Sequence, residues 1–421
     1  MRRIFKDESQ SSILIIFIKN FLLLFAFRGF GVIANLVVTI LAGRTLSVEL
    51  MSEYNLVINL SNIIVIPLVM GVNSSLLKIL PESSPKDRED ILGTVLIGNI
   101  ALCLAVSVIG FLVTPLICRL PNLTPCSWYL AIALAIVTNG CILADTVLKV
   151  DERFTRLGVA KIAGSVFLLI SYLTCILLFH DTDIYKYAVF NVIGQIVVLS
   201  VSVYKIAKIR FSFRKDIAKS MYKISFMYML SWLLITGLNS ADVLIISGMR
   251  PKYDSGIFST YQAGIRNYFS IFYNDIFATV MLPVLINRGI DNKGLVKKVF
   301  RLLPVIFAVL CAGTTAVLLV LLFAFGQKYP VIWLFVFLEA AGIAFQGIYY
   351  FLNSLLVTEG REGAKTSFEI LGKPFLLFII IIVLCTKLFG LTGTFISFTL
   401  NQAILALLLI LRYRKTTGLA G

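Results

Sequence analysis

Residues 95–113 read VLIGNIALCLAVSVIGFLV, a run without a single charged side chain. A helix needs about 20 predominantly apolar residues to cross a hydrocarbon core that is about 30 Å thick. Two further runs share this character, AVLCAGTTAVLLVLLFAF at residues 308–325 and FLLFIIIIVLC at residues 375–385. Runs of this kind predict an integral membrane protein.

The composition extends this prediction to the whole chain. Of the 421 residues 59% are hydrophobic and 14% are charged, whereas soluble domains average about 45–50% and about 25%. We predict an all-α integral membrane protein with about twelve transmembrane helices. The expected spans are residues 14–42, 54–77, 91–114, 128–149, 158–179, 184–206, 225–248, 255–286, 302–325, 330–356, 367–387 and 390–411.

The positive charge is concentrated on one side of these spans. A net charge of +16 would suggest nucleic acid as a partner of a soluble protein, but here 27 of the 38 Lys and Arg residues fall in alternate connections. The opposite connections hold seven, which are Arg44, Arg119, Lys186, Arg250, Lys252, Lys328 and Lys387. Basic connections stay in the cytoplasm. We therefore expect both termini in the cytoplasm and no nucleic-acid partner.

A short internal repeat suggests two halves. Residues 162–169 (IAGSVFLL) recur as residues 370–377 (ILGKPFLL), 208 positions later. Six helices per half would relate two bundles by a pseudo-twofold axis along the membrane normal. The predicted domains are a six-helix bundle over 1–206, a basic cytoplasmic linker over 207–224, and a second bundle with a short tail over 225–421.

Two other sequence features predict absences. The basic residues Arg2, Arg3 and Lys6 precede an apolar segment that is too long for a signal peptide, so no cleavable leader is expected. The seven cysteines are scattered without a CxxC spacing. They predict neither a disulfide nor a metal site, and no cofactor is expected.

Polar side chains at membrane depth are costly and mark candidate functional sites. Arg28 lies in the middle of the first span, and Asn35 and Thr39 follow within about 20° of it on a helix. The second span carries Asn55, Asn59, Asn62 and Asn73 on one expected face. These amides are equally consistent with substrate contact and with hydrogen bonds between packed helices.

The second half of the chain carries charges at the same depth. Arg266 and Tyr273 share one face of the eighth span with Gln262, while Asp242 lies in the seventh span, Asp275 in the eighth and Glu339 in the tenth. A buried salt bridge, for instance between Arg266 and one of the two aspartates, is the alternative to a functional role.

Two arginines at central depth favour an anionic substrate. Arginine stays protonated and presents a planar fork of donors that suits phosphate. We predict substrate-binding roles for Arg28, Arg266, Asn35, Asn59, Asn62 and Tyr273. Asp242, Asp275 and Glu339 are the candidates for ion coupling, and no residue is predicted to be catalytic.

Several short motifs resemble the polysaccharide flippases of the multidrug/oligosaccharidyl-lipid/polysaccharide exporter (MOP) superfamily, which translocate O-antigen and capsule repeat units. They are Arg28-Gly29-Phe30-Gly31, Glu53-Tyr54-Asn55, Gly256-Ile257-Phe258-Ser259, Leu282-Pro283-Val284 and Phe389-Gly390-Leu391-Thr392-Gly393-Thr394. The resemblance implies two six-helix bundles around a cavity with alternating access. It implies cavity arginines for the pyrophosphate, with Arg28 and Arg266 in fitting helices.

The same resemblance implies the substrate and the setting. The substrate would be an undecaprenyl-pyrophosphate-linked oligosaccharide, moved from the cytoplasmic to the periplasmic leaflet of a bacterial inner membrane. Coupling to a proton or sodium gradient is expected, and a polysaccharide polymerase and a chain-length regulator are possible partners.

Three other classes remain as alternatives. A membrane glycosyltransferase or polymerase would need a large extramembrane loop, and no expected external loop is long. A cation-coupled multidrug antiporter of the same superfamily usually carries an acid in its first helix, where this chain has Arg28. A major-facilitator carrier would show a Gly-x-x-x-Asp-Arg signature, which the loop at 78–90 lacks.

Overall fold

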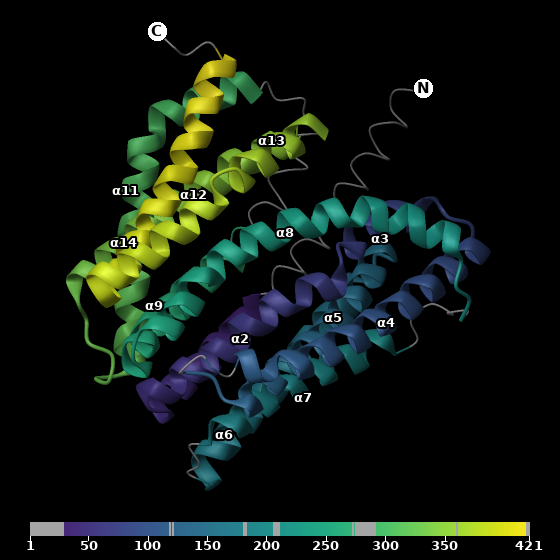
Figure 1. Ribbon diagram of the computed structural model, residues 1–421, viewed down its shortest axis with the longest axis horizontal. Helices are drawn as coiled ribbons and strands as arrows, with labels where there is room; N and C mark the ends of the chain where they lie inside the picture. Colours follow the sequence, from purple (N-terminus) through teal and green to yellow (C-terminus); the bar gives the residue numbers. More distant parts are fainter. Residues whose placement is uncertain are drawn as a thin grey trace, which may run out of the picture. The chain divides into compact units, whose positions relative to one another are not determined.

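The computed structural model describes residues 29–117, 119, 122–179, 183–204, 211–271, 273, 292–358 and 361–417, and these residues form helices and short connections with no strand among them (Figure 1). The first described helix is Gly29–Thr45. It is followed by α2 (Val48–Val69), α3 (Val72–Ile79), η1 (Leu80–Glu82), α4 (Pro85–Ile117), α5 (Pro125–Val150), α6 (Phe154–Thr174), η2 (Cys175–Phe179) and α7 (Ile184–Val203). The chain continues with α8 (Lys215–Met249), α9 (Lys252–Ile271), α11 (Asn292–Phe325), α12 (Trp333–Thr358), α13 (Arg361–Gly372) and α14 (Phe375–Thr417).

Length and hydropathy mark most of these helices as membrane spans. Within the described ranges, 9 helices are long and apolar enough to cross a bilayer. The prediction of an all-α, multi-pass membrane protein is thereby confirmed. The number of twelve spans and the pseudo-twofold axis remain predictions.

The chain divides into two compact units. Unit 1 comprises Met1–Thr39, Leu60–Pro115 and Pro125–Leu230, and unit 2 comprises Ile40–Asn59, Leu116–Thr124 and Ser231–Gly421. Two helices, α2 and α8, contribute one half to each unit. The predicted bundles over 1–206 and 225–421 stay a prediction, and α8 begins at Lys215, inside the stretch predicted as a linker.

The second predicted span is interrupted. α2 ends at Val69, and the chain passes through the left-handed region at Met70 (φ 48°) and Gly71 (φ 70°) before α3 begins. A Cβ at Gly71 would lie 2.2 Å from the carbonyl oxygen of Ser225, so only glycine fits this crossing. Asn73 consequently lies in α3, and its prediction on the same helical face as the asparagines of α2 was wrong.

The last helix is a hairpin of two antiparallel segments. At Gly390 the backbone is non-helical (φ 61°, ψ −138°), a conformation that essentially only glycine adopts. Beyond it the chain folds back, because the Asn401 side chain donates to the Phe378 carbonyl at 3.3 Å and the Thr386 and Thr394 hydroxyls are 3.0 Å apart. The two predicted final spans, 367–387 and 390–411, therefore meet at this turn.

The two copies of the internal repeat have different local structures. The first lies wholly within α6, whereas the second contains the break between α13 and α14. The second copy has Pro374 where the first has Val166, and proline lacks the N–H that a helix interior needs. The repeat is thus weaker support for duplicated bundles than its sequence suggested.

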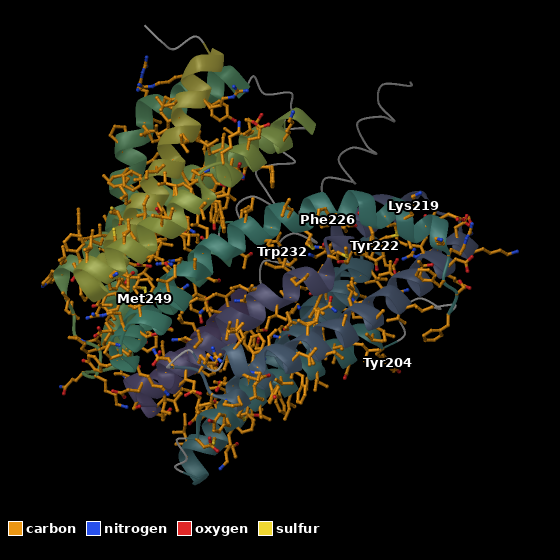
Figure 2. The ribbon with its side chains drawn as sticks, in the orientation of Figure 1. Tyr204, Lys219, Tyr222, Phe226, Trp232 and Met249 are labelled. Carbon is orange, nitrogen blue, oxygen red and sulfur yellow. The ribbon has the colours of Figure 1, made fainter. Side chains whose placement is uncertain are left out.

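Unit 1 is packed through close helix contacts. α6 and α7 approach at Gly164 and Gly194, since a Cβ at the first would lie 2.3 Å from Val198 and one at the second 2.8 Å from Leu168. Small residues allow such approach between membrane helices. The first half of α8 adds Tyr222, whose hydroxyl fills the space beside Gly98. Figure 2 shows Lys219, Tyr222, Phe226, Trp232 and Met249 following one another along α8.

Unit 2 has an extensive apolar core. Buried Leu, Ile, Phe and Tyr side chains of α8, α12, α13 and α14 form one cluster that includes Leu352, Leu355, Phe378, Leu405 and Leu409. α12 packs against both α11 and α14 and is the central helix of this unit. Its buried face also carries acidic and amide side chains, which define the site described next.

Candidate functional site

Three helices of unit 2 bring a buried group of charges together. α8 supplies Asp242, α9 supplies Arg266 and α12 supplies Glu339, with 2%, 2% and 0% of each residue exposed. All three positions lie in helix interiors. We call this group the charged triad. It confirms the sequence-based expectation that Arg266 and Asp242 can form a buried salt bridge, and it adds Glu339 to the pair.

All three nitrogens of the Arg266 guanidinium donate hydrogen bonds to carboxylates. Its Nη1 donates to Asp242 Oδ2 at 2.5 Å, while Nε and Nη2 each donate to one oxygen of Glu339 at 3.3 Å. Its central carbon Cζ lies 3.5 Å from the ring centroid of Phe398 and 5.7 Å from that of Phe258. The fork is thus shared between two carboxylates and stacked on an aromatic face.

The triad carries a formal charge of −1, because one cation faces two anions. Taking charges out of water costs several kcal/mol per ion even when they are paired, so a buried ion pair is weak evidence for a stabilising role. At membrane depth such groups usually serve a substrate or ion pathway. The charged triad is therefore the strongest candidate site among the described residues.

A layer of neutral amides adjoins the triad on the same helices. Gln346, seven residues after Glu339 on α12, donates to Asn239 Oδ1 at 3.3 Å and to the Tyr350 hydroxyl at 3.1 Å. Gln262, four residues before Arg266, donates to the Asn239 carbonyl at 3.4 Å. These spacings place each amide on the helical face of its charged neighbour.

Two acceptors in this layer are unused. The side-chain oxygens Oε1 of Gln262 and of Gln346 are buried and have no hydrogen-bond partner within the described parts of the chain. A buried amide oxygen without a donor costs about 1–3 kcal/mol. Carboxylate and amide oxygens of this kind are the ligands that hard cations take in proteins.

The other predicted residues occupy different settings. Tyr273 is buried, its hydroxyl lies 3.0 Å from that of Ser354, and its ring centroid is 5.3 Å from that of Tyr350. Asn59 is buried and its side chain donates to the Asn55 carbonyl at 2.8 Å. Asn35 and Asn62 are exposed. Arg28 and Asp275 lie outside the described residues.

The sequence did not single out every polar residue that the structure uses. Asn239 was missed, because one Asn in an apolar helix gives no pattern. Asp145 of α5 was not among the predicted site residues, and the structure pairs it with Lys161 of α6 at 2.6 Å. Such partners come from neighbouring helices, and only the helix packing identifies them.

The fold and the buried charges define a multi-pass membrane protein with the features of a transporter, and comparison with known proteins gives its family. Residues 17–287, more than half of the chain, match the family model described as polysaccharide biosynthesis protein. The chain therefore belongs to this family, and the resemblance to polysaccharide flippases of the MOP superfamily is confirmed. A search of curated proteins gave no match.

Solved structures of the same fold are transporters and flippases. The lipid II flippase MurJ in an inward closed conformation aligns with a TM-score of 0.69 at 15% identity, covering 93% of this chain and 87% of that one. An inward-facing multidrug resistance MATE family transporter of the MOP superfamily gives 0.67 at 15% identity, covering 92% and 94%. A MOP superfamily transporter from Pyrococcus furiosus gives 0.55 at 13% identity, covering 95% and 96%.

These identities establish the shared fold. Taken with the family, they confirm the expectation that the chain is a membrane transporter or flippase and not an enzyme.

Proposed function

We propose that this protein is a flippase that moves undecaprenyl-pyrophosphate-linked oligosaccharide repeat units from the cytoplasmic to the periplasmic leaflet of a bacterial inner membrane. Support comes from membership of a polysaccharide biosynthesis family and from a fold shared with a lipid II flippase. Both termini lie in the cytoplasm in this proposal, as the distribution of Lys and Arg predicts. A polysaccharide polymerase and a chain-length regulator act on the same glycan.

The charged triad is the observation that carries a transport role. An apolar core would hold α8, α9 and α12 together without the desolvation cost of three buried ions. The three residues are nevertheless completely enclosed in the described structure. An arginine between two carboxylates has a use in transport if it changes its carboxylate partner during the transport cycle.

The pairing also determines when Arg266 binds phosphate. Its Nε, Nη1 and Nη2 all donate to Asp242 or Glu339, so the two carboxylates compete with a pyrophosphate for the donors of the fork. Substrate binding therefore draws Arg266 away from at least one carboxylate. In our proposal Arg28 holds the pyrophosphate with it, and Asn35, Asn59, Asn62 and Tyr273 contact the headgroup.

In this proposal, cation binding switches Arg266 from its carboxylate partners to the phosphate. A proton or a sodium ion that neutralises Asp242 or Glu339 weakens the hold on Arg266 and frees its donors for the phosphate. When the cation leaves, the carboxylate recaptures Arg266 and the phosphate is released. The gradient thus drives alternating access through competition for one guanidinium. Asp275 stays a further coupling candidate.

A second function is favoured by one observation. Multidrug resistance transporters share the fold, and a buried site of charge −1 next to amide oxygens also suits an organic cation. A cation-coupled multidrug antiporter is the alternative, and a drug-driven ion flux without lipid transfer distinguishes it. A membrane glycosyltransferase or polymerase ranks below both.

The test is reconstitution in liposomes with a labelled undecaprenyl-pyrophosphate oligosaccharide, with leaflet exchange measured under an imposed ion gradient. Arg266→Ala and Arg28→Ala are compared with wild type, and Arg301→Ala, which changes an exposed arginine of α11, is the matched control. We expect at least a tenfold loss of exchange in the first two variants and none in the control. Wild type that exchanges no lipid-linked glycan but moves organic cations would overturn the proposal.

A further inference from the structure

Unit 2 contains two segments from the first half of the chain. The start of α2 and the end of the connection between α4 and α5 (residues 122–124) pack with the corner formed by the end of α8 and the start of α9. The remainder of α2, and nearly all of α4 and α5, belong to unit 1. Both segments thus leave their own bundle at the end that the charge distribution predicts to be external.

The contact between α2 and α9 is close. A Cβ added at Gly256 would lie 2.1 Å from the carbonyl oxygen of Val48, so the two backbones nearly touch. The Ser52 and Ser255 hydroxyls are 2.9 Å apart, and one turn further the Asn55 side chain donates to Ser259 at 3.2 Å. Small residues with hydroxyl or amide groups therefore form this contact on both sides.

The hydrogen bonds continue into the two connections. Ser255 also lies 2.6 Å from the Ser247 hydroxyl of α8. Asn122 donates to the carbonyls of Ser247 and Arg250 at 2.6 and 3.2 Å. It thus satisfies carbonyl groups that the end of α8 leaves without helical partners.

An acid anchors the group. The carboxylate of Glu53 is buried; it accepts from Thr124 at 2.8 Å and pairs with Lys252 at 3.4 Å. The ammonium of Lys252 is partly exposed, with 37% of its side chain accessible, so water reaches the edge of the pair. We call Ser52, Glu53, Asn55, Asn122, Thr124, Ser247, Lys252, Ser255, Gly256 and Ser259 the polar latch.

The chemistry of the polar latch differs from that of the permanent core of unit 2. That core is apolar and aromatic, so opening it would expose hydrocarbon side chains to water. The latch is made of hydroxyl, amide and carboxylate groups that water can satisfy after separation. Hydrogen bonds of this type between membrane helices contribute only about 0.6 kcal/mol each. The contact is specific but inexpensive to break.

We propose that the polar latch is a releasable external closure, which opens when the substrate headgroup leaves on the periplasmic side. The inference rests on the proposed function. Residues 48–59 and 122–124 separate from the α8–α9 corner in the open state and return to it in the closed state. Glu53 sets the register of closure, because its buried carboxylate accepts from both the connection and α9.

Disulfide trapping tests the release. In a chain with the seven native cysteines replaced, Ser52→Cys and Ser255→Cys put two thiols where the hydroxyls are 2.9 Å apart, and copper-phenanthroline removes two electrons and two protons to join them. The matched control is Thr386→Cys with Thr394→Cys, a pair 3.0 Å apart in the α14 hairpin, which does not open in our proposal. We expect at least a tenfold loss of transport in the first pair, restored by reductant, and no loss in the control.

A second measurement does not depend on the substrate. Gly256→Ala forces α2 and α9 apart, whereas Gly313→Ala adds a Cβ that meets nothing within 4 Å. We expect the first to raise by several-fold the rate at which a membrane-impermeant maleimide labels Ser247→Cys, and the second to leave this rate unchanged. Equal labelling in both, failure of the first pair to cross-link, or full transport by the cross-linked protein overturns the latch. Faster labelling in a protein that transports no lipid-linked glycan refutes the flippase and leaves the latch standing.

Discussion

Units 1 and 2 both bury polar side chains in the middle of their helices, but with different chemistry. In unit 1, Asn99 of α4 and Asn139 of α5 exchange hydrogen bonds at 3.2 and 2.9 Å, and Asn99 also donates to the Leu68 carbonyl at 3.0 Å. In unit 2, Arg266 lies between Asp242 and Glu339.

The difference separates a packing device from a candidate site. The asparagine pair is neutral and its groups are matched with one another, so nothing in it favours a bound ion. The triad has a formal negative charge and adjoins two amide oxygens that have no donor among the described residues. Buried polar groups that are fully hydrogen-bonded indicate a structural role. Buried polar groups that are incompletely bonded indicate a ligand that binds and dissociates.

The largest effect is expected from removing the cation of the triad. Arg266→Ala leaves two carboxylates buried without a counter-charge, and breaking a buried pair in this way costs about 3–5 kcal/mol. Thermal unfolding in lipid nanodiscs measures the loss. The triple variant Asp242→Leu, Arg266→Met, Glu339→Leu removes all three charges, and we expect wild-type stability or better but no transport. An equally unstable triple variant would contradict the view that the triad serves function at a cost in stability.

Next in size is the effect of each acid on coupling. Asp242→Asn or Glu339→Gln leaves Arg266 with one carboxylate and a neutral site, so cation binding no longer governs the release of the guanidinium. We expect at least a tenfold loss of gradient-driven glycan accumulation, equivalent to about 1.4 kcal/mol. The control is Glu369→Gln, which changes an exposed acid of α13. Unaltered coupling in both acid variants would remove the triad from the ion pathway.

A smaller effect is expected in unit 1. Asn99 and Asn139 pair as neutral amides, and membrane double-mutant cycles give about 0.6 kcal/mol for such couplings, with a maximum near 1.7. A cycle with Asn99→Ala and Asn139→Ala, measured by unfolding, should fall in this range and leave transport unchanged. Loss of ion coupling in either single variant would show that the asparagine pair also takes part in transport. It would contradict the distinction between a structural pair in unit 1 and a functional triad in unit 2.

The smallest change in stability is expected at the amide layer. Gln346→Leu removes one oxygen without a donor together with two donated hydrogen bonds, so the opposing terms nearly cancel and unfolding should shift by less than about 1 kcal/mol. The ion concentration that gives half-maximal transport should nevertheless rise by several-fold. An unchanged ion dependence would mean that the carboxylates of the triad bind the cation without the amide oxygen of Gln346.

Several parts of the molecule were readable from single segments. The charge-free run at 95–113 became α4, and the turn between the last two spans was expected beside Gly390. The break after Val69 was not expected, because Pro67 is compatible with the helix that contains it and the left-handed crossing at Gly71 depends on its contact with Ser225. The assignment of Asn73 failed for this reason.

The candidate site was predictable in its members but not in its pairing. Arg266, Asp242 and Glu339 each stood out, since a charge in an apolar helix is visible without a structure. The sequence could not predict that these three side chains contact one another or that Asn239 lies beside them, because the residues are spread over 100 positions. The polar latch was hidden for the same reason, because serines at helix ends are common in any sequence.

The sequence by itself determined the membrane class, the helical content and the charged residues at membrane depth, because these follow from local hydropathy and from backbone groups that must bond within their own segment. Only the tertiary structure decided which charges meet, which amide oxygens lack a donor within the described residues and which segments of the first half of the chain join unit 2. Those outcomes depend on how distant helices pack, and packing between membrane helices is governed by shape and small-residue contacts that leave little trace in hydropathy.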